Sequence, residues 1–241
     1  MNEKLREIIA SHKNIVFFGG AGVSTASGIP DFRSANGIYS QGGVIPPEEI
    51  LSHTFFMERT AEFYKFYREK MLYPSAKPND CHFALARLES LGRLKAVVTQ
   101  NIDDLHQKAG SRTVYELHGS VCRNRCMRCG KKYGLDYILQ TEGVPRCEKC
   151  GGIIKPDVVL YEESLDPDCI RDSCRAIAEA EVLIIGGTSL TVYPAASFIN
   201  YFSGEKLVLI NKTPTQADRI ADLVLHEGIA EAMRLEDGEI S

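Results

Sequence analysis

The chain has 241 residues, of which 44% are hydrophobic and 25% charged. These values are typical of a globular protein with one substantial domain and a small second unit; they exclude disordered and fibrous classes, and the formal net charge of -4 excludes a global attraction to nucleic acid or lipid. No stretch of eighteen apolar residues and no basic-then-apolar leader occurs, so we expect no membrane span and no export, and we place the protein in the cytoplasm.

The first predicted elements are a helix and a buried strand. Residues 3–11 have apolar side chains at helical spacing, and residues 14–18 form a short apolar run that ends in glycines. Comparable apolar runs follow at 95–99, 114–117, 182–185, 207–210 and 223–225, with helical patterns between several of them. This alternation predicts an α/β fold in which a Rossmann-like parallel sheet carries helices on both faces.

A glycine-rich loop follows the first predicted strand. Gly20 and Gly22 stand between a strand and a helical segment, which is typical of a loop that brings backbone N–H groups close to a dinucleotide phosphate. A dehydrogenase would have a third glycine where Thr25 stands and an acidic residue near positions 41–42, which hold Gln and Gly. Hydride transfer is therefore a poor fit. A plain tight turn does not explain why residues 31–33 follow as an acid, a ring and a base.

Two segments interrupt the alternation of strands and helices. Residues 34–78 combine a glycine-containing loop with an aromatic-rich helix, and residues 121–155 carry four paired cysteines. We interpret the first as a helical insertion and the second as a metal module, which together form a small zinc-binding and helical lobe. The remaining residues, 1–33, 79–120 and 156–241, form the Rossmann-like domain. A lobe inserted at the carboxyl ends of the strands would create an interdomain cleft.

The paired cysteines predict one structural zinc ion. Cys126-x-x-Cys129 and Cys147-x-x-Cys150 are separated by seventeen residues, which is the spacing of a tetrahedral four-thiolate site. Four thiolates leave no open coordination position, so the metal has a structural role. Zinc binding contributes roughly 10–16 kcal/mol to the folding of small modules of this kind.

The surroundings of these cysteines leave other readings open. Residues 121–155 hold eight Lys or Arg against three Asp or Glu, which would suit a zinc ribbon on nucleic acid, but such a surface is more often simply solvated, and we expect no nucleic acid partner. Cys122 is a spare thiol rather than a fifth ligand. Metal binding in a reducing compartment explains the cysteine clustering better than disulfides do.

Six segments in order make the sequence recognisable. They are GAGVSTASGIPDFR at 20–33, TQNIDDLHQKAG at 99–110, ELHGS at 116–120, KPDVVLYEE at 155–163, GTSLTVYPAA at 187–196 and LVLIN at 207–211. Together with the cysteine spacing, they resemble the sirtuin family over nearly the whole chain, and the match is closest to the short bacterial members.

The resemblance implies an NAD-dependent protein lysine deacetylase. In that reaction the acyl-lysine carbonyl oxygen attacks the nicotinamide ribose, nicotinamide leaves, and O-acyl-ADP-ribose is formed. Catalytic roles fall to His118, the general base toward a ribose hydroxyl, and to Asn101 and Asp103. His82 and His106 match helical family positions and are read as structural. Mono-ADP-ribosyl transfer on the same scaffold, removal of other uncharged acyl groups and a non-catalytic NAD or zinc module are the alternatives.

The same resemblance assigns NAD contacts along the chain. Gln100 to Asp103 follow the second predicted strand, where a doubly wound fold presents ligand contacts. Phe32 would shield the reactive sugar, and Arg33 would bind phosphate. The complete cofactor set is Ala21, Gly22, Thr25, Asp31, Phe32, Arg33, Gln100, Asn101, Ile102, Asp103, His118, Thr188, Ser189, Asn211 and Ile229.

Acetylated proteins are the expected partners of a monomeric enzyme. Their backbone would pair with an extended segment formed by Val158, Val159, Leu160 and Tyr161. The family continues with Phe-Gly-Glu where this chain has Tyr161-Glu162-Glu163. The added hydroxyl and acid predict a shifted peptide preference, toward basic flanks.

Acyl choice is predicted from one helix. Family members that prefer succinyl- or malonyl-lysine carry a Tyr and, three residues later, an Arg. Tyr64 matches the first position, but Tyr67 occupies the second, and Arg68 lies beside it. We therefore expect removal of acetyl or other uncharged acyl groups rather than succinyl.

Overall fold

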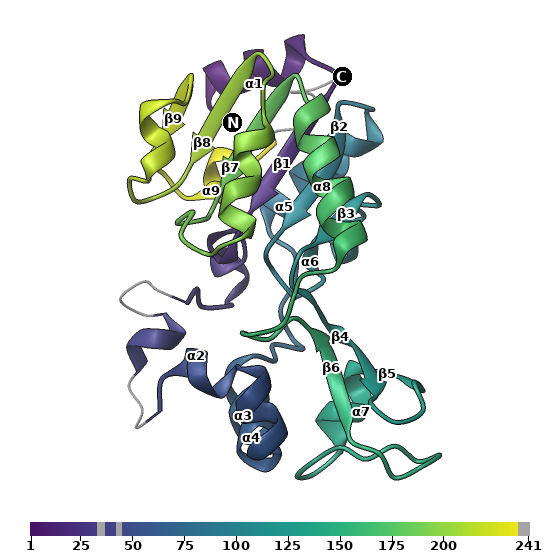
Figure 1. The fold of residues 1–241 in the computed structure, drawn as a ribbon. Coiled ribbons are helices and arrows are strands. Elements are labelled where there is room, and N and C mark those ends of the chain that lie inside the picture. The colour runs from purple at the N-terminus through teal and green to yellow at the C-terminus, as the bar shows by residue number, and fades with distance from the viewer. Residues whose placement is uncertain (33–36, 42–44, 236–241) are drawn as a thin grey trace.

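The computed structural model describes residues 1–32, 37–41 and 45–235 (Figure 1). Its larger lobe is built on a parallel six-stranded sheet in the order β3-β2-β1-β7-β8-β9. The strands are β1 (Ile15–Gly19), β2 (Leu94–Thr99), β3 (Val114–Glu116), β7 (Val182–Gly186), β8 (Lys206–Ile210) and β9 (Leu223–Leu225). The predicted α/β class is confirmed, and the predicted strand bounds differ from these by one residue at most.

Helices cover both faces of this sheet. Phe17 of β1 packs with α1 (Glu3–Ser11), α5 (Asp80–Ser90) and α9 (Ile229–Ala232) on one face. Phe18 packs with α8 (Pro167–Glu179) on the other face, where the 3-10 helices 195–201 and 216–219 also lie. Because both faces are covered, β1 and β7 are buried along their whole length and read as continuous apolar runs rather than as alternating ones.

Among the described residues, the smaller lobe contains a second sheet and four α-helices. The antiparallel sheet has the order β5-β4-β6, with β4 (Gly119–Cys126), β5 (Lys132–Gly134) and β6 (Ile154–Val158). The helices are α2 (Pro47–Ile50), α3 (His53–Glu58), α4 (Thr60–Lys70) and α7 (Leu135–Gln140). Gly119 pairs with Val158, so this sheet extends beyond the predicted module of residues 121–155 at both ends.

One apolar core unites the two inserted segments. Phe56, Phe63 and Tyr64 from the helical insertion pack with Ile138 and Ile154 of the cysteine module. The rings of Phe56 and Phe63 meet edge to face, with centroids 4.9 Å apart, and the Tyr64 hydroxyl donates to the Ile154 carbonyl. Each insertion therefore buries its apolar face against the other. No described helix has the length and apolar content that a membrane crossing requires.

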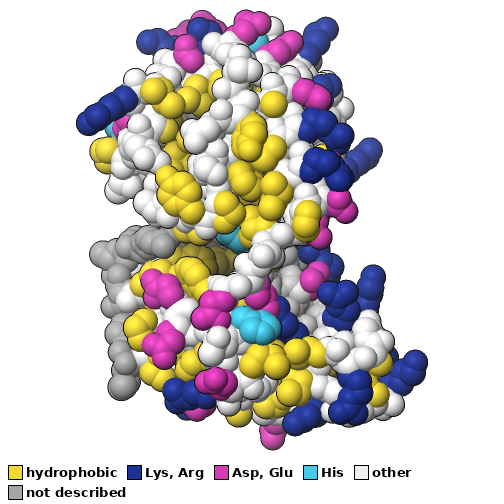
Figure 2. Space-filling model, viewed as in Figure 1, with side chains coloured by type: hydrophobic (Ala, Val, Ile, Leu, Met, Phe, Trp, Pro, Cys, Tyr) yellow, Lys and Arg dark blue, Asp and Glu magenta, His cyan; other side chains and the backbone are white. Residues whose placement is uncertain are grey.

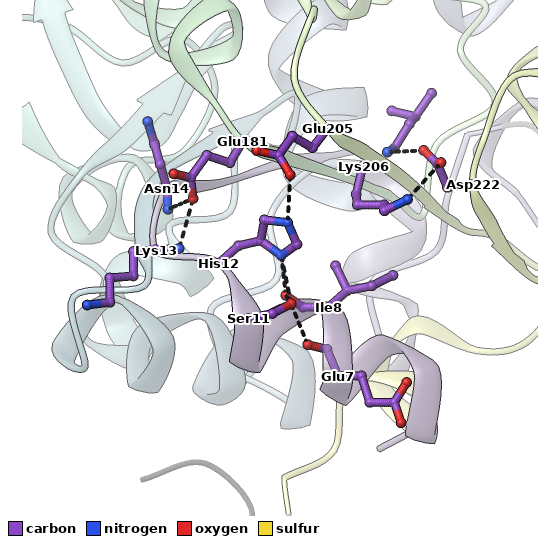
Figure 3. Close-up of polar contacts among 11 residues, drawn as sticks. Glu7, Ile8, Ser11, His12, Lys13, Asn14, Glu181, Glu205, Lys206 and Asp222 are labelled. Atoms are coloured by element: carbon purple, nitrogen blue, oxygen red, sulfur yellow. Dashed lines mark hydrogen bonds and ion pairs between the residues drawn. The ribbon is translucent and has the colours of Figure 1, made fainter.

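Polar contacts fix the amino ends of the strands, away from the smaller lobe (Figure 3). The Glu181 carboxylate accepts from the backbone N–H groups of Lys13 and Asn14, at 3.0 and 3.1 Å. His12 bonds through Nδ1 to the Ile8 carbonyl, and its Nε2 lies 3.6 Å from Glu205. These contacts anchor the turn between α1 and β1 to the edge opposite the carboxyl strand ends.

Two buried histidines lie behind the sheet, where α5 contacts α6 (Leu105–Ala109). The His82 and His106 rings are 4.7 Å apart. Asn79 N–H donates to Nδ1 of His82, whereas Nε2 of His82 and both ring nitrogens of His106 have no hydrogen-bond partner in the described chain. Burial lowers the pKa of His82 to about 4 and that of His106 to about 3. Both rings are therefore neutral in the folded protein.

We expect this pair to make the fold sensitive to acid. Unfolded histidines take up protons below pH about 6.5, so stability is complete above that pH and is lost as pH falls toward 4. Each ring contributes roughly 3 kcal/mol to this loss. His106→Leu should reduce the difference in unfolding free energy between pH 7 and pH 4 by about that amount, measured by urea titration. His226→Leu, at a half-exposed site, is the control; equal pH dependence of wild type and His106→Leu would contradict the interpretation.

Candidate active site and metal centre

A cleft of about 1030 Å³ lies between the two lobes. The carboxyl ends of β1, β2 and β7 open into it, and β6 reaches it from the smaller lobe. Figure 2 shows the hollow, with apolar side chains at its walls and acidic side chains on the neighbouring surface of the smaller lobe. Neighbouring parallel strands end at one edge of a sheet, so residues distant in the sequence meet in this cleft.

The structure brings the predicted site residues together. The predicted phosphate-binding residue Arg33 lies outside the described residues. All the others proposed for cofactor and substrate line the cleft, namely Ala21, Gly22, Thr25, Asp31, Phe32, Gln100, Asn101, Ile102, Asp103, His118, Val158, Val159, Leu160, Tyr161, Thr188, Ser189, Asn211 and Ile229.

The glycine loop packs against the turn after β7. Gly22 N–H donates to the Gly187 carbonyl at 2.8 Å, and a Cβ on Gly22 would lie 2.8 Å from the Gly187 Cα. The Gly20 N–H is also used, by the Gly186 carbonyl. The N–H groups of Gly20 and Gly22 are therefore used within the protein, and the absence of a Cβ at these positions permits close contact between two protein loops.

Other amides of the same loop remain available. The backbone N–H groups of Ala21 and Thr25 have no acceptor among the described residues, whereas those of Val23 and Ser24 bond within the loop. Both amides belong to residues that line the cleft. Two unpaired N–H groups beside a cavity are suited to bind phosphate oxygens.

A three-residue network joins β1 and β2 at their carboxyl ends. The Ser24 hydroxyl donates to Asp103 Oδ2 at 2.6 Å and accepts from Asn101 Nδ2 at 3.0 Å. Leu105 N–H donates to the other Asp103 oxygen at 2.9 Å. Burial raises the pKa of Asp103, and these hydrogen bonds offset part of the increase. Since Asn101 uses Nδ2 for Ser24, its Oδ1 is left to accept a hydrogen bond from a ligand or water.

His118 has its tautomer fixed by the backbone. Its Nδ1 lies 2.9 Å from the Gln100 carbonyl, which can only accept, so Nδ1 carries the proton and Nε2 is a free base. Burial lowers the pKa of His118, although the bond to Gln100 opposes the shift. No described residue bonds to Nε2. A neutral imidazole with an unpaired nitrogen in a cleft can act as a general base.

The remaining cofactor residues lie along the ends of β2, β7 and β8. Gln100 Nε2 donates to the Thr188 hydroxyl at 3.1 Å, which connects the ends of β2 and β7. Ser189 is exposed beside Thr188, and Asn211 follows β8, where its Nδ2 donates to the Thr213 carbonyl. Ile229 is buried and leaves no room for a Cβ on Gly186.

The proposed substrate segment lies directly beside His118. β6 ends at Val158, and the N–H groups of Val159, Leu160 and Tyr161 are already bonded to the His118 carbonyl, the Glu163 carboxylate and the Leu51 carbonyl. The Val159 carbonyl has no partner among the described residues. Pairing with a peptide stays a prediction, and this carbonyl is the backbone acceptor open to it.

Sequence reasoning missed residues that act inside the protein. Ser24 was read only as part of a motif, although it connects Asn101 to Asp103. Glu163 ion-pairs with Lys155 and contacts Nδ1 of His53, both at 2.9 Å, and thereby fixes the turn after Leu160. The motif GAGVS contained a signal for Ser24, and the motif KPDVVLYEE contained Lys155 and Glu163, but His53 lies 110 positions from Glu163 and no local pattern pairs the two.

The four predicted zinc ligands meet in the smaller lobe. Their sulfur atoms lie within 4.8 Å of one another, with Cys126 and Cys150 at 3.4 Å and Cys129 and Cys147 at 3.6 Å. Tetrahedral zinc with bonds of about 2.3 Å places its sulfurs about 3.8 Å apart, which fits this cluster.

The backbone turns repeat around the metal site. Gly130 N–H donates to the Cys126 carbonyl, and Gly151 N–H donates to the Cys147 carbonyl. Both glycines have a φ of +71°, a conformation that other residues adopt at a cost. The cluster forms a closed site for one structural zinc, because four thiolates fill its coordination sphere.

Comparisons with known proteins agree with this geometry. A model of the Sir2 family matches residues 20–194. An NAD-dependent protein deacetylase of Clostridium acetobutylicum is 58% identical over 233 residues, covering 95% of each chain. One of Clostridium perfringens is 60% identical over 233 residues, covering 95% of this chain and 96% of the relative.

Solved structures give the same result. A Sir2 complex with a p53 peptide and NAD is 41% identical and has a TM-score of 0.85. The match covers 97% of this chain and 96% of that one. A Sir2 structure bound to acetylated peptide is 38% identical, with a TM-score of 0.86 and complete coverage of both chains.

Zinc removal should unfold the smaller lobe. Cys147→Ser removes one of four ligands, and we expect zinc content to fall from about one ion per chain to below about 0.2, because a three-thiolate site binds weakly. Protease cleavage within residues 121–155 should then appear at native temperature. Cys169→Ser, on α8, should keep its zinc. A stable, protease-resistant and metal-free Cys147→Ser protein would contradict the structural role.

Proposed function

The chain belongs to the Sir2 family, and we propose that it removes acetyl groups from lysine side chains of proteins in a reaction that consumes NAD. The observation that carries this function is the convergence, in one cleft, of the His118 base, the Ser24–Asn101–Asp103 network and the free Val159 carbonyl. His118 and the network follow strands of the larger lobe, whereas Val159 follows β6 of the smaller lobe.

The two sides of the cleft have different tasks. The carboxyl strand ends of the larger lobe provide the NAD side, with the amides of Ala21 and Thr25 facing the phosphates. NAD, when bound, supplies the electrophilic ribose carbon and the nicotinamide leaving group. The helical insertion 34–78 and the zinc module 121–155 provide the opposite wall, and zinc acts by holding that wall in shape rather than by contacting the reactants.

Orientation carries most of the catalysis. An amide oxygen is a weak nucleophile, and fixing it against its target can contribute roughly 7–11 kcal/mol. Val159 accepts from the acyl-lysine N–H, Oδ1 of Asn101 positions a ribose hydroxyl or water, and Nε2 of His118 takes a proton from a ribose hydroxyl. The lowered pKa of His118 keeps this nitrogen unprotonated at neutral pH.

The partners are acetylated proteins, which the enzyme meets as a monomer in the cytoplasm. One chain forms the whole cleft, which supports a monomer. Eight reduced cysteines, four of them gathered for a metal, support a reducing compartment.

Replacing the base should separate chemistry from binding. His118→Ala should lower acetyl-peptide turnover by at least about 100-fold, because the variant lacks the imidazole that takes the proton. Mass spectrometry would follow O-acetyl-ADP-ribose, and calorimetry should still detect NAD binding. His12→Ala, at the opposite edge of the sheet, is the control. Wild-type-like turnover by His118→Ala would remove this role, and ADP-ribose on protein in place of O-acetyl-ADP-ribose would indicate the transferase reaction.

Acyl choice should favour uncharged groups. Tyr67 is buried and its hydroxyl has no partner in the described chain, while burial holds its pKa well above the ordinary value, so it is neutral. Arg68 does not line the cleft. Its Nε donates to the Ile138 carbonyl at 3.1 Å, and its guanidinium lies over the Tyr64 ring.

We expect kcat/KM for an acetyl-lysine peptide to exceed that for the succinyl form by at least about tenfold, because a carboxylate buried without a partner costs more than 1.4 kcal/mol. Matched peptides in one NAD-coupled assay would measure the ratio. Arg68→Gln should leave it unchanged. Faster turnover of the succinyl peptide, or a ratio that collapses in Arg68→Gln, would overturn this assignment.

A further inference from the structure

A hydrogen bond joins two tyrosines that line the cleft. The hydroxyls of Tyr39 and Tyr161 are 2.6 Å apart. Tyr39 lies in the 3-10 helix Ile38–Gln41, and Tyr161 lies in the segment that follows β6. The family's usual Phe at position 161 could not make this bond, so the added hydroxyl of Tyr161 has a specific partner.

Tyr39, which belongs to the helical insertion, is attached to the residues proposed to face the sugar. Ile38 N–H donates to the Asp31 carbonyl and Tyr39 N–H donates to the Phe32 carbonyl, both at 2.9 Å. The rings of Phe32 and Tyr39 meet edge to face, with centroids 5.6 Å apart. A displacement of Tyr39 would therefore move the Phe32 ring and the Asp31 backbone with it.

On the peptide side, Tyr161 is held independently of Tyr39. Its N–H donates to the Leu51 carbonyl and its carbonyl accepts from His53 N–H, at 3.0 and 2.9 Å. The next residue, Glu162, has a φ of +75°, where the family has glycine, and its carboxylate accepts from Thr54 N–H at 2.9 Å. Backbone and side-chain bonds thus fix the Tyr161 end of the pair to the start of α3.

We propose that the Tyr39–Tyr161 hydrogen bond is a positioning device in which the rigid peptide segment, acting through Tyr39, holds Phe32 over the NAD site. The proposal rests on the proposed function, because it assigns Phe32 to the NAD side of the cleft. It has an unusual consequence: a hydroxyl on the peptide-binding segment sets the affinity for NAD more than the affinity for peptide. Both tyrosines are positioning residues, since each acts through Phe32.

A double-mutant cycle tests the device. Tyr39→Phe, Tyr161→Phe and the double variant keep both rings, and Tyr161→Phe restores the family's residue, so all three should fold with a Tm like that of wild type. Since a hydrogen bond of this kind is worth about 1 kcal/mol, each single variant should bind NAD about fivefold more weakly in calorimetry, and the double variant no more weakly than either single one. In Tyr39→Phe, the dissociation constant for an acetyl-lysine peptide without NAD should change less than about twofold.

The controls and contrary outcomes are distinct. Tyr201→Phe, an exposed tyrosine outside the cleft, should bind NAD like wild type. Unchanged NAD affinity in the single variants, additive losses in the double variant, or a loss confined to peptide binding would each overturn the proposal. Wild-type protein that binds NAD but releases no acetyl group would overturn only the proposed function, and wild-type protein that binds no NAD would overturn both.

Discussion

The site depends on one close backbone contact, between the turn after β1 and the turn after β7. Gly22 and Gly187 approach so closely that a Cβ on Gly187 would lie 2.5 Å from the Val23 nitrogen, and Gly187 has a φ of +58°. This contact seats the 3-10 turn that carries Ser24, which in turn holds Asn101 and Asp103. A side chain at either glycine would push that turn away from the sheet and separate the polar groups of three strands.

The opposite wall of the cleft has a different physical basis. Each inserted segment is too small to form a core of its own. Phe56 and Phe63 of one therefore pack with Ile138 and Ile154 of the other in a single core. The thiolate cluster fixes the far end of that core, where Cys126 and Cys147 are themselves buried. Metal binding and aromatic packing are therefore coupled, and both position the end of β6 beside His118.

Charge within the cleft is arranged for neutrality at the reacting centre. His118 is buried and kept neutral, with its single N–H given to the Gln100 carbonyl. At the margin, Glu163 pairs with Lys155 and contacts Nδ1 of His53. Such a site desolvates a neutral amide at small cost and offers an imidazole nitrogen that is ready to accept a proton.

The sequence by itself determined the class of fold, the family, the four zinc ligands and many of the residues that line the cleft, because apolar runs, cysteine spacing and ordered motifs are local patterns that are read along the chain. Only the tertiary structure decided how those residues act. It showed that the N–H groups of Gly20 and Gly22 bond to the end of β7 and the residue after it, that Ser24 joins Asn101 to Asp103, and that Tyr39 meets Tyr161 at the cleft. Each of these contacts depends on which segments, up to 166 positions apart, the parallel sheet and the second lobe bring together, and no local pattern encodes such a pairing.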